Sequence, residues 1–585
     1  MATAHLTSLA EIRRRIPLMT KREFFRSARS FPIKGFVFRD SVIGATALLI
    51  ALTVMVTWPQ ALHLNTMVVA HDDTLLSMWR LGWIAHALKA DPGHLFDGNI
   101  FYPNVHTLAY SDATLLEGLI AAPWLWAGTN PVLVYNLLLL GGIVSSGIGM
   151  FVLVRHLTNN PDAALVSAVI FTIAPYRIEH VMHLELQWTV WMPLTLLAIH
   201  RLFEEGSMRW GIAAGMLLSL QLLSSVYYGA FLGMITAVFI VLLAASQPSR
   251  VRNAVGPLCI AAIVPAIVAL AYARPYVEVA RLFGTRAAGE IATFSASVPS
   301  YITAPTQNWI WGGTGSSVEG NERHLFPGLV AVALAAMAFA KRPRRLFAWI
   351  YLGVGIVAFE FSLGMNGAVY RWLHDHVWAL GGFRAPARFG VLVVCALAVL
   401  AGFGFEQLQR LISRRSALIV SVLAALALEC GAGPLPMDTV PTQLPDVYKF
   451  LKSRNQAVVV ELPIDDGYLT RMFMYWSAQH LSRLVNGYSG MIPRDYELTL
   501  TRMSRFPNAA AIARLRELEV RYILVHESFI QEQQRLGLIL ELARRPELLP
   551  HGKFRSWVGT TLVFELKPAD QESSSSQNDK RSNVQ

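Results

Sequence analysis

Two adjacent carboxylates are the first residues whose type and spacing point to chemistry. Asp72 and Asp73 follow His71 in a stretch rich in aspartate and aromatic residues. Neighbouring carboxylates repel each other, which raises the pKa of one and prepares it to accept a proton, or else they bind a cation. The structural alternative is that Asp72 caps a helix starting near Thr74, with Asp73 in the first turn, where the helix dipole favours acids.

A second polar stretch carries two histidines. His180 and His183 are three residues apart and would share one face of a helix, with Glu179 beside them. Imidazoles and carboxylates bind divalent metals, and His71 or Asp72 would complete the set. The alternative is a pair of ordinary hydrogen-bonded histidines at a membrane surface.

Two arginines stand at the entrance of a later apolar segment. Arg384 and Arg388 gain nothing from the helix dipole near the start of a helix, so each needs another partner. A phosphate fits, because guanidinium binds it through two parallel hydrogen bonds. The alternative is that they reach toward lipid headgroups. Further candidate substrate-binding residues are His71, Tyr102, Asp112, His180, His183, Arg274 and Glu290.

The elements that must position these residues are membrane spans. Of 585 residues, 54% are hydrophobic and 15% charged, against about 25% charge in soluble proteins. The mean hydropathy of +0.42 excludes a water-soluble globule. The net charge of +11 is therefore first a topology signal, and nucleic acid is not an expected partner. The three cysteines lie in apolar runs, which predicts neither disulfides nor a thiolate metal site.

Uncharged apolar stretches long enough to cross a bilayer take about 20 residues each. The segment 113–128 is also apolar, but Glu117 and Pro123 interrupt it, and we expect it to lie in or dip into the outer leaflet. The chain offers eleven spans, two of them in 210–246 with a turn near Ser224: 41–59, 132–154, 162–176, 186–200, 210–246, 253–273, 325–340, 346–362, 387–405 and 416–431.

The basic clusters between these spans predict the topology. They fall on the side of the amino terminus, which is therefore cytoplasmic in an inner (plasma) membrane. All candidate residues then lie on the opposite side, where they could line one cleft. The expected organisation is a basic cytoplasmic arm (1–40), a transmembrane module (41–432) with external loops 60–131, 177–185, 274–324 and 363–386, an extracytoplasmic α/β domain (433–568) and a disordered tail (569–585).

The composition after residue 432 returns to that of a soluble protein. Apolar runs at 458–462, 522–525 and 562–566 are typical of buried strands. The segment 508–520 has the pattern of an amphipathic helix between two of them. A small α/β domain is the expected fold of this part.

Five stretches carry a family resemblance: NIFYPNVHTLAYSD from 99, NPVLVYNLLLL from 130, APYRIEHVMHLELQW from 174, ERHLFPG from 322 and FRAPARFG from 383. With the basic arm, the first span and the large acidic loop, residues 40–410 resemble the GT-C superfamily of polytopic membrane glycosyltransferases. The similarity is to a bacterial branch near YfhO-like and mannosyltransferase-like proteins. It implies a mainly α bundle of about 11 spans and a polyprenyl-phosphate-linked sugar donor.

The resemblance also implies residue roles. A first-loop acid of that superfamily acts as the base, and Asp72 or Asp73 occupies this place. A second-loop acid assists, and Glu179 is the nearest match, although the family more often has Asp there and this chain offers His180 beside it. Arg384 or Arg388 would hold the lipid phosphate. A divalent cation is an open cofactor assignment, with Asp72, His180 and His183 as candidate ligands.

These observations lead to one function with two alternatives. The sequence predicts a membrane glycosyltransferase that moves a sugar from a polyprenyl phosphate to an external glycan, lipid or protein. A lipid or glycan transporter or flippase is the first alternative, although it calls for ionisable groups deep within spans, and the charges here sit mostly at span ends. A non-catalytic envelope assembly factor is the second.

Overall fold

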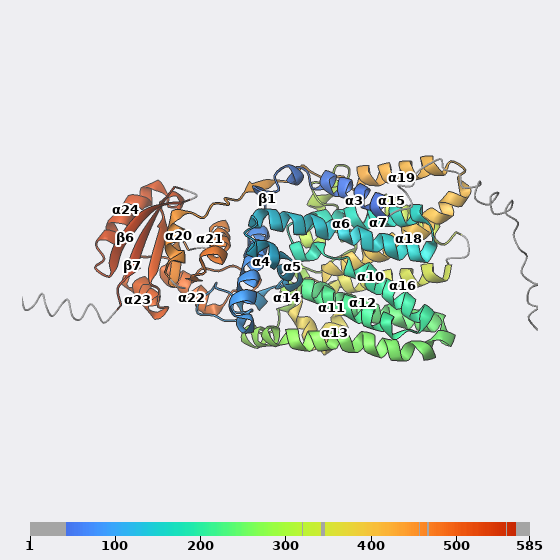
Figure 1. Ribbon diagram of the computed structural model, residues 1–585, viewed down its shortest axis with the longest axis horizontal. Coiled ribbons are helices and arrows are strands. Elements are labelled where there is room, and N and C mark those ends of the chain that lie inside the picture. Colours follow the sequence, from blue (N-terminus) through green and yellow to red (C-terminus); the bar gives the residue numbers. More distant parts are fainter. Residues whose placement is uncertain are drawn as a thin grey trace, which may run out of the picture.

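The computed structural model describes residues 42–318, 320–340, 345–454, 457–464, 467–556 and 559–568. The predicted basic arm (1–40) and tail (569–585) lie outside these residues. Figure 1 shows a bundle of long helices at one end of the molecule and a β-sheet flanked by helices at the other.

Every segment predicted as a span contains a helix. Helices α11 and α12 are separated at Ser225, where the turn was expected. The helices of the bundle are α3 (Val42–Val56), α6 (Pro131–Thr158), α7 (Pro161–Ile173), α10 (Trp191–Glu205), α11 (Met208–Ser224), α12 (Val226–Ser246), α13 (Pro248–Phe283), α15 (Leu329–Met337), α16 (Arg345–Ser362), α18 (Gly390–Leu411) and α19 (Arg415–Glu429).

Five helices in the described part of the chain are long and apolar enough to cross a membrane. Asparagine caps followed by proline in the first turn fix where two of them begin, at Asn130 and Asn160. That the other predicted spans also cross the membrane, which would give eleven in all, stays a prediction. The five are Pro131–Thr158, Pro161–Glu179, Val226–Ser246, Pro248–Phe283 and Pro386–Leu411.

Shorter helices form the connections on the side that faces the sheet. In Figure 1, α4 runs across the ends of the long helices, between the bundle and the sheet. Helix α5 has 12 residues, well short of the length of a span, as expected for this segment. The connecting α-helices, all but α4 having 12 residues or fewer, are α4 (Asp72–Ala90), α5 (Leu115–Trp126), α8 (Pro175–Glu179), α9 (Leu184–Gln187), α14 (Ala288–Thr293) and α17 (Ala368–His376).

The 3-10 helices give the loops their shape. Those in the bundle are η1 (Gln60–Leu62), η2 (Pro92–His94), η3 (Thr107–Tyr110), η4 (Val298–Ile302), η5 (Gly312–Ser317), η6 (Asn321–Arg323), η7 (Gly364–Asn366), η8 (Trp378–Gly382) and η9 (Pro386–Phe389), and η10 (Glu527–Phe529) belongs to the C-terminal part. The loop residues that bear on chemistry sit mostly beside η3, η6, η8 and η9.

The C-terminal part is built on a five-stranded sheet in the order β4-β3-β5-β7-β6. Strand β3 is parallel to β4 and β5, whereas β7 is antiparallel to β5 and β6. Strands lie at all three predicted positions. The elements are β3 (Val458–Leu462), β4 (Arg483–Leu484), β5 (Tyr522–His526), β6 (Leu548–Ser556), β7 (Gly559–Leu566), α20 (Asp446–Lys452), α21 (Tyr468–His480), α22 (Arg494–Met503), α23 (Ala509–Glu517) and α24 (Glu532–Ala543).

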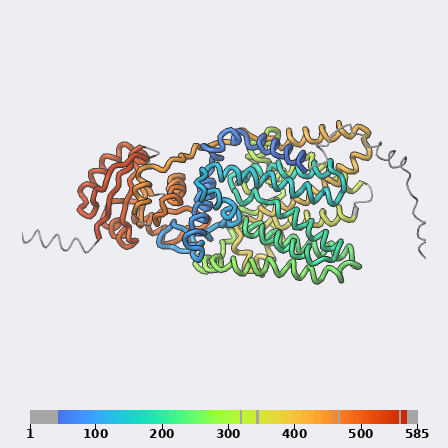
Figure 2. The backbone as a smooth tube through the Cα atoms, viewed as in Figure 1, coloured from blue at the N-terminus to red at the C-terminus, as the bar shows by residue number. Residues whose placement is uncertain are grey.

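Several contacts join this part to the bundle, among them a strand pair and a helix pair. Strand β1 (Met67–Val69), at the start of the first loop, pairs antiparallel with β2 (Met437–Thr439), as the meeting of the blue and orange segments in Figure 2 illustrates. Helix α4 packs on α21 so closely that a Cβ at Gly82 would lie 2.9 Å from the Cβ of Ala478. The C-terminal part is therefore packed directly against the loops of the bundle.

Candidate active site

A polar cavity of about 100 Å³ lies where the loops of the bundle meet the C-terminal part. Its wall includes residues of α4, the turn after η3, the segment around α9, the start of α12 and the loops before α14 and α18. Tyr488, Ser489 and Gly490 contribute from the C-terminal side. Four arginines face three acids there, which favours an anionic ligand. The charged lining residues are Asp73, Arg80, Asp112, His183, Glu185, Arg286, Arg384 and Arg388.

Asp73 is held at the cavity wall from two sides. His71, rather than Asp72, caps α4, because its Nδ1 accepts a hydrogen bond from the backbone N–H of Asp73 at 3.1 Å. The Tyr488 hydroxyl donates to Asp73 Oδ1 at 3.3 Å, and His183 Nδ1 lies 3.4 Å from Oδ2. The carboxylate of Asp73 thus touches the second loop and the C-terminal part at once.

Asp72 points elsewhere. Successive helical residues are about 100° apart around the axis. Asp72 Oδ2 forms an ion pair with Arg471 of α21 at 2.8 Å, and the Arg471 guanidinium lies over the Tyr488 ring. Asp72 does not line the polar cavity, so the structure separates the two aspartates that the sequence places together.

Arg388 has an internal partner. Its Nε donates to Glu322 Oε1 at 2.9 Å, and both residues are buried. Burial alone would raise the pKa of the Glu322 carboxyl, but the Arg388 guanidinium holds it at about 2. Reaching toward lipid headgroups is therefore the wrong interpretation for Arg388, since a buried carboxylate already satisfies it.

Two further arginines of the cavity are also paired. Arg80 Nη2 donates to Ser111 Oγ at 2.6 Å, and its Nη1 lies 3.8 Å from Glu185. Arg286 bonds Glu290 at 2.9 Å and the carbonyl oxygen of Gly490 at 2.7 Å. Both guanidiniums therefore tie the walls of the cavity together.

Arg384 differs from these three. It lines the cavity half-buried, and among the described residues its guanidinium has no carboxylate partner. It lies over the Phe294 ring at 5.0 Å, which holds the side chain without neutralising it. Its charge is the one most available to a bound anion.

Asp112 fixes the start of α12. Its Oδ2 accepts from the Ser225 hydroxyl and its Oδ1 from the backbone N–H of Val226, each at 2.8 Å. Burial raises the pKa of the Asp112 carboxyl, although these bonds oppose the shift. Both oxygens are therefore engaged in positioning a helix at the cavity wall.

The second loop places its polar residues behind the cavity. Glu179 does not line it, because its Oε1 lies 3.1 Å from His324 Nδ1, and this bond raises the pKa of His324. His180 is buried with its Nε2 3.7 Å from Glu322 Oε2. Of the three residues of this loop singled out from the sequence, only His183 lines the cavity, where Glu185 joins it.

The structure also changes the candidate metal ligands. One ligand atom each of His180, His183 and Glu322 lies within 4.8 Å of the others. Asp72, which the sequence suggested as the third ligand, is not in this group because it is bound to Arg471 on another face of α4. Glu322 takes its place.

Five predicted binding residues do not line the cavity: His71, which caps α4, His180, which is buried behind the cavity wall, and three others. Tyr102 lines a separate cavity of about 490 Å³ together with Arg483, whose guanidinium lies over its ring. Arg274 is 83% exposed and pairs with Glu278. Glu290 acts on the cavity only through its bond to Arg286.

An apolar groove adjoins the polar cavity. It measures about 230 Å³, runs between α12, α13 and η8, and shares Asp112, Tyr227 and Arg286 with the cavity. Its remaining wall is made largely of apolar side chains such as Val279, Trp378 and Phe383. A charged head and an apolar tail would therefore find adjacent surfaces here.

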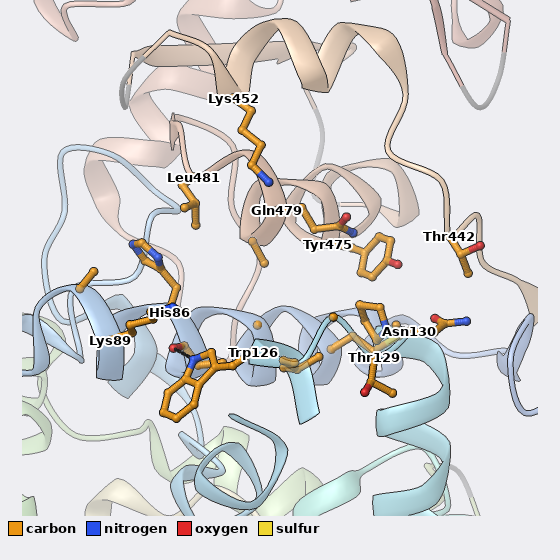
Figure 3. A pocket seen from close by; sticks show the side chains of 18 residues that line it. His86, Lys89, Trp126, Thr129, Asn130, Thr442, Lys452, Tyr475, Gln479 and Leu481 are labelled. Atoms are coloured by element: carbon orange, nitrogen blue, oxygen red, sulfur yellow. Dashed lines mark hydrogen bonds between the residues drawn. The ribbon is translucent and has the colours of Figure 1, made fainter. Parts of the chain in front are cut away.

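A much larger cavity lies on the other side of α4. Figure 3 shows Lys452 of α20 pointing into it opposite His86 of α4, near Trp126. It measures about 920 Å³, and no Asp or Glu is among its described lining residues. The smaller cavity holds three carboxylates beside four arginines, which suit a base and an anionic leaving group together, so we place the chemistry there.

Several residues of the site were not singled out from the sequence. Arg80, Glu185, Tyr227, Arg286, Glu322 and Tyr488 all contribute to the cavity or its support. A charged side chain among apolar residues of one helix, such as Arg80 in α4, was the sequence pattern that could have pointed to some of them. No sequence pattern pointed to Tyr488, because its position at the cavity depends on how the C-terminal part packs against the bundle.

Comparisons with known proteins locate the fold but not the activity. No family model and no curated protein matches the sequence. The arabinofuranosyltransferase AftD from mycobacteria is 13% identical with a TM-score of 0.59, over 91% of this chain and 40% of AftD. A mutant of AftD gives TM-scores of 0.57 and 0.55. ArnT from Cupriavidus metallidurans, also 13% identical, scores 0.47.

This chain thus spans less than half the length of AftD. At this level of identity the likeness shows the fold alone. The branch near YfhO-like proteins stays a prediction, and so do donor, acceptor and base. The chain has a mainly helical fold similar to that of the arabinofuranosyltransferase AftD.

Proposed function

We propose that this chain transfers a sugar from a polyprenyl phosphate to an acceptor hydroxyl at the polar cavity. The acceptor oxygen attacks the anomeric carbon, the bond from that carbon to the phosphate oxygen breaks, and polyprenyl phosphate leaves. The acceptor proton passes to a carboxylate of the cavity. The sugar ends on the acceptor, the lipid leaves as polyprenyl phosphate and the proton moves to the carboxylate, so the reaction needs no further reactant.

The observation that carries this proposal is an unneutralised arginine where a polar cavity meets an apolar groove. Arg384 supplies a guanidinium with no carboxylate partner among the described residues, and phosphate is its natural ligand. The groove between α12 and α13 offers an apolar wall to the first isoprene units. Arg286 and Tyr227 line both spaces and would hold the junction of lipid and phosphate.

Asp73 is the best placed general base. It lines the cavity, and neither of its contacts, Tyr488 and His183, is a fixed cationic partner. Asp112 has both oxygens committed to α12, and Glu185 faces Arg80. We therefore assign the base to Asp73, with Asp72 as a positioning residue that ties α4 to α21.

The membrane arrangement is part of the same proposal. Eleven spans, a cytoplasmic amino terminus and an extracytoplasmic 433–568 domain would place the cavity at the outer surface of an inner membrane. Tyr488, Ser489 and Gly490 belong to that domain and form part of the cavity wall. The domain would then guide a glycan, lipid or protein acceptor to Asp73.

The experiment compares the two adjacent aspartates in a transfer assay. Purified full-length protein is supplied with radiolabelled pentofuranosyl or hexosyl polyprenyl phosphates and membrane acceptors. General base catalysis contributes about 100- to 10,000-fold, so Asp73→Asn should lower turnover within that range. Asp72→Asn, the comparison one residue away, should lose much less activity than Asp73→Asn, because Asp72 lies outside the cavity and acts only by tying α4 to α21.

Three outcomes would overturn the proposal or part of it. If Asp73→Asn were as active as wild type, Asp73 would not be the general base. Movement of intact lipid-linked sugar across vesicles, with no glycosidic bond formed by any variant, would favour the transporter. Loss of function on deleting the C-terminal part, without a detectable transfer reaction in the intact protein, would favour the assembly factor.

A further inference from the structure

We propose that His180, His183 and Glu322 bind a divalent metal ion of the zinc type at the wall of the polar cavity. The proposal goes beyond sugar transfer and does not depend on it. Two imidazoles and one carboxylate form a common ligand set of zinc sites that keep one coordination position open. Loop 177–185 supplies both histidines, and η6 supplies the glutamate.

The distances suit this ligand set. The three ligand atoms lie within 4.8 Å of one another, and His180 Nε2 is 3.7 Å from Glu322 Oε2. Ligands of a tetrahedral zinc ion are about 2.0 to 2.2 Å from the metal and hence about 3.4 Å from each other. A contraction of at most about 1.4 Å, within side-chain rotation, would bring all three into the coordination sphere.

His180 provides an independent sign of a missing partner. The residue is 2% exposed, and its Nε2 is buried without a hydrogen-bond partner among the described residues. A buried polar nitrogen is costly to leave unsatisfied. That nitrogen faces the carboxylate of Glu322 across a gap too long for a hydrogen bond, and a metal ion bound to its neutral, unprotonated form would bridge it.

The surrounding residues resemble the outer partners of a metal site. Metal-bound histidines usually give their second ring nitrogen to a carboxylate, and His183 Nδ1 lies 3.4 Å from Asp73 Oδ2. The Gln187 amide donates to the backbone carbonyl of His180 at 2.7 Å and so fixes the loop. Arg388 donates to Glu322 Oε1 from Nε and Nη2 but to Oε2 from Nε alone, at 3.2 Å, so Oε2 keeps more capacity for an ion beside His180.

The charges nearby limit which ion fits. Arg388 opposes a cation, whereas Asp73 and Glu322 favour one, and His180 and His183 are neutral ligands. A metal that prefers nitrogen is therefore expected over one that needs an all-oxygen shell. Because His183 lines the cavity, the open position would face the place where a water or a phosphate oxygen binds.

The test uses metal alone, without a sugar donor. Full-length protein is purified with a tag other than polyhistidine, stripped with EDTA and titrated with Zn²⁺ in a calorimeter. Co²⁺ then reports the geometry through its visible absorption. We expect one ion per chain in wild type. His183→Gln should weaken binding by about 100-fold or more, beyond the loss typical of an outer partner.

His94→Gln is the matched control, because His94 pairs with Asp91 at the surface, far along the chain from both metal-binding segments. It should bind like wild type. His180→Gln serves as a second ligand variant, with melting profiles recorded to show that each variant is folded. Absence of one-per-chain binding in wild type, or equal binding in folded His183→Gln, would overturn the site. Either result leaves the transferase proposal standing, since no transfer is measured.

Discussion

Arg384 gives the sharpest prediction about the donor site. Its guanidinium lines the polar cavity without a carboxylate partner among the described residues. A hydrogen bond to a charged group contributes about 1.5 to 3 kcal/mol. At about 1.4 kcal/mol for each tenfold change, Arg384→Gln should raise the Kd for a polyprenyl phosphate by about 10- to 140-fold.

Arg274→Gln is the control for this substitution. It removes the same charge, but Arg274 is 83% exposed and pairs with Glu278 outside the cavity. Its Kd should stay within about twofold of wild type, because an exposed pair contributes little and salt screens it. Binding is measured by native mass spectrometry of the detergent-solubilised protein. An unchanged Kd for Arg384→Gln, or equal losses in both variants, would refute the assignment.

Three further predictions concern stability, measured as melting temperature in detergent. Burial raises the pKa of Asp112 above 3.8, so its contribution is full below about pH 3.8 and falls as the pH rises through the folded pKa. Wild type should therefore lose stability relative to Asp112→Asn as the pH rises from about 3.8 through the folded pKa, and parallel curves would contradict this. Glu322→Gln leaves buried Arg388 without its charge partner and should destabilise by about 3 to 5 kcal/mol, so an unchanged melting temperature would show that the pair is not buried. Gly404→Ala should lower the melting temperature because the added Cβ would collide with the backbone of α15, whereas Gly141→Ala, with nothing within 4 Å, should not; equal effects would argue against this packing.

The helical part could be predicted largely from apolar length. A segment needs about 20 apolar residues to cross the bilayer, so such segments are easy to find in a sequence. A helix lies within every predicted span, and α11 and α12 are separated at Ser225, where the turn was expected. The strands of the C-terminal sheet follow from short apolar runs in the same way. The β1–β2 pairing did not, because it joins residues more than 360 positions apart, and nothing local specifies it.

The candidate site was predictable by region but not by residue. Charge counting brings Asp73, Asp112, His183 and both later arginines to one side, and the cavity contains all of them. Sequence could not distinguish Asp73 from Asp72, because that depends on which face of α4 meets the bundle. Nor could it show that Glu322, remote in sequence, engages Arg388 and leaves Arg384 as the available charge.

The central claim is that the cavity beside Arg384 is the donor site. Its most direct test is a structure of the full-length protein with a bound polyprenyl phosphate. We predict the phosphate within about 3 Å of the Arg384 guanidinium and the first isoprene units in the groove between α12 and α13. A phosphate bound instead in the large cavity between Lys89 and Lys452, on the other side of α4, would contradict the account.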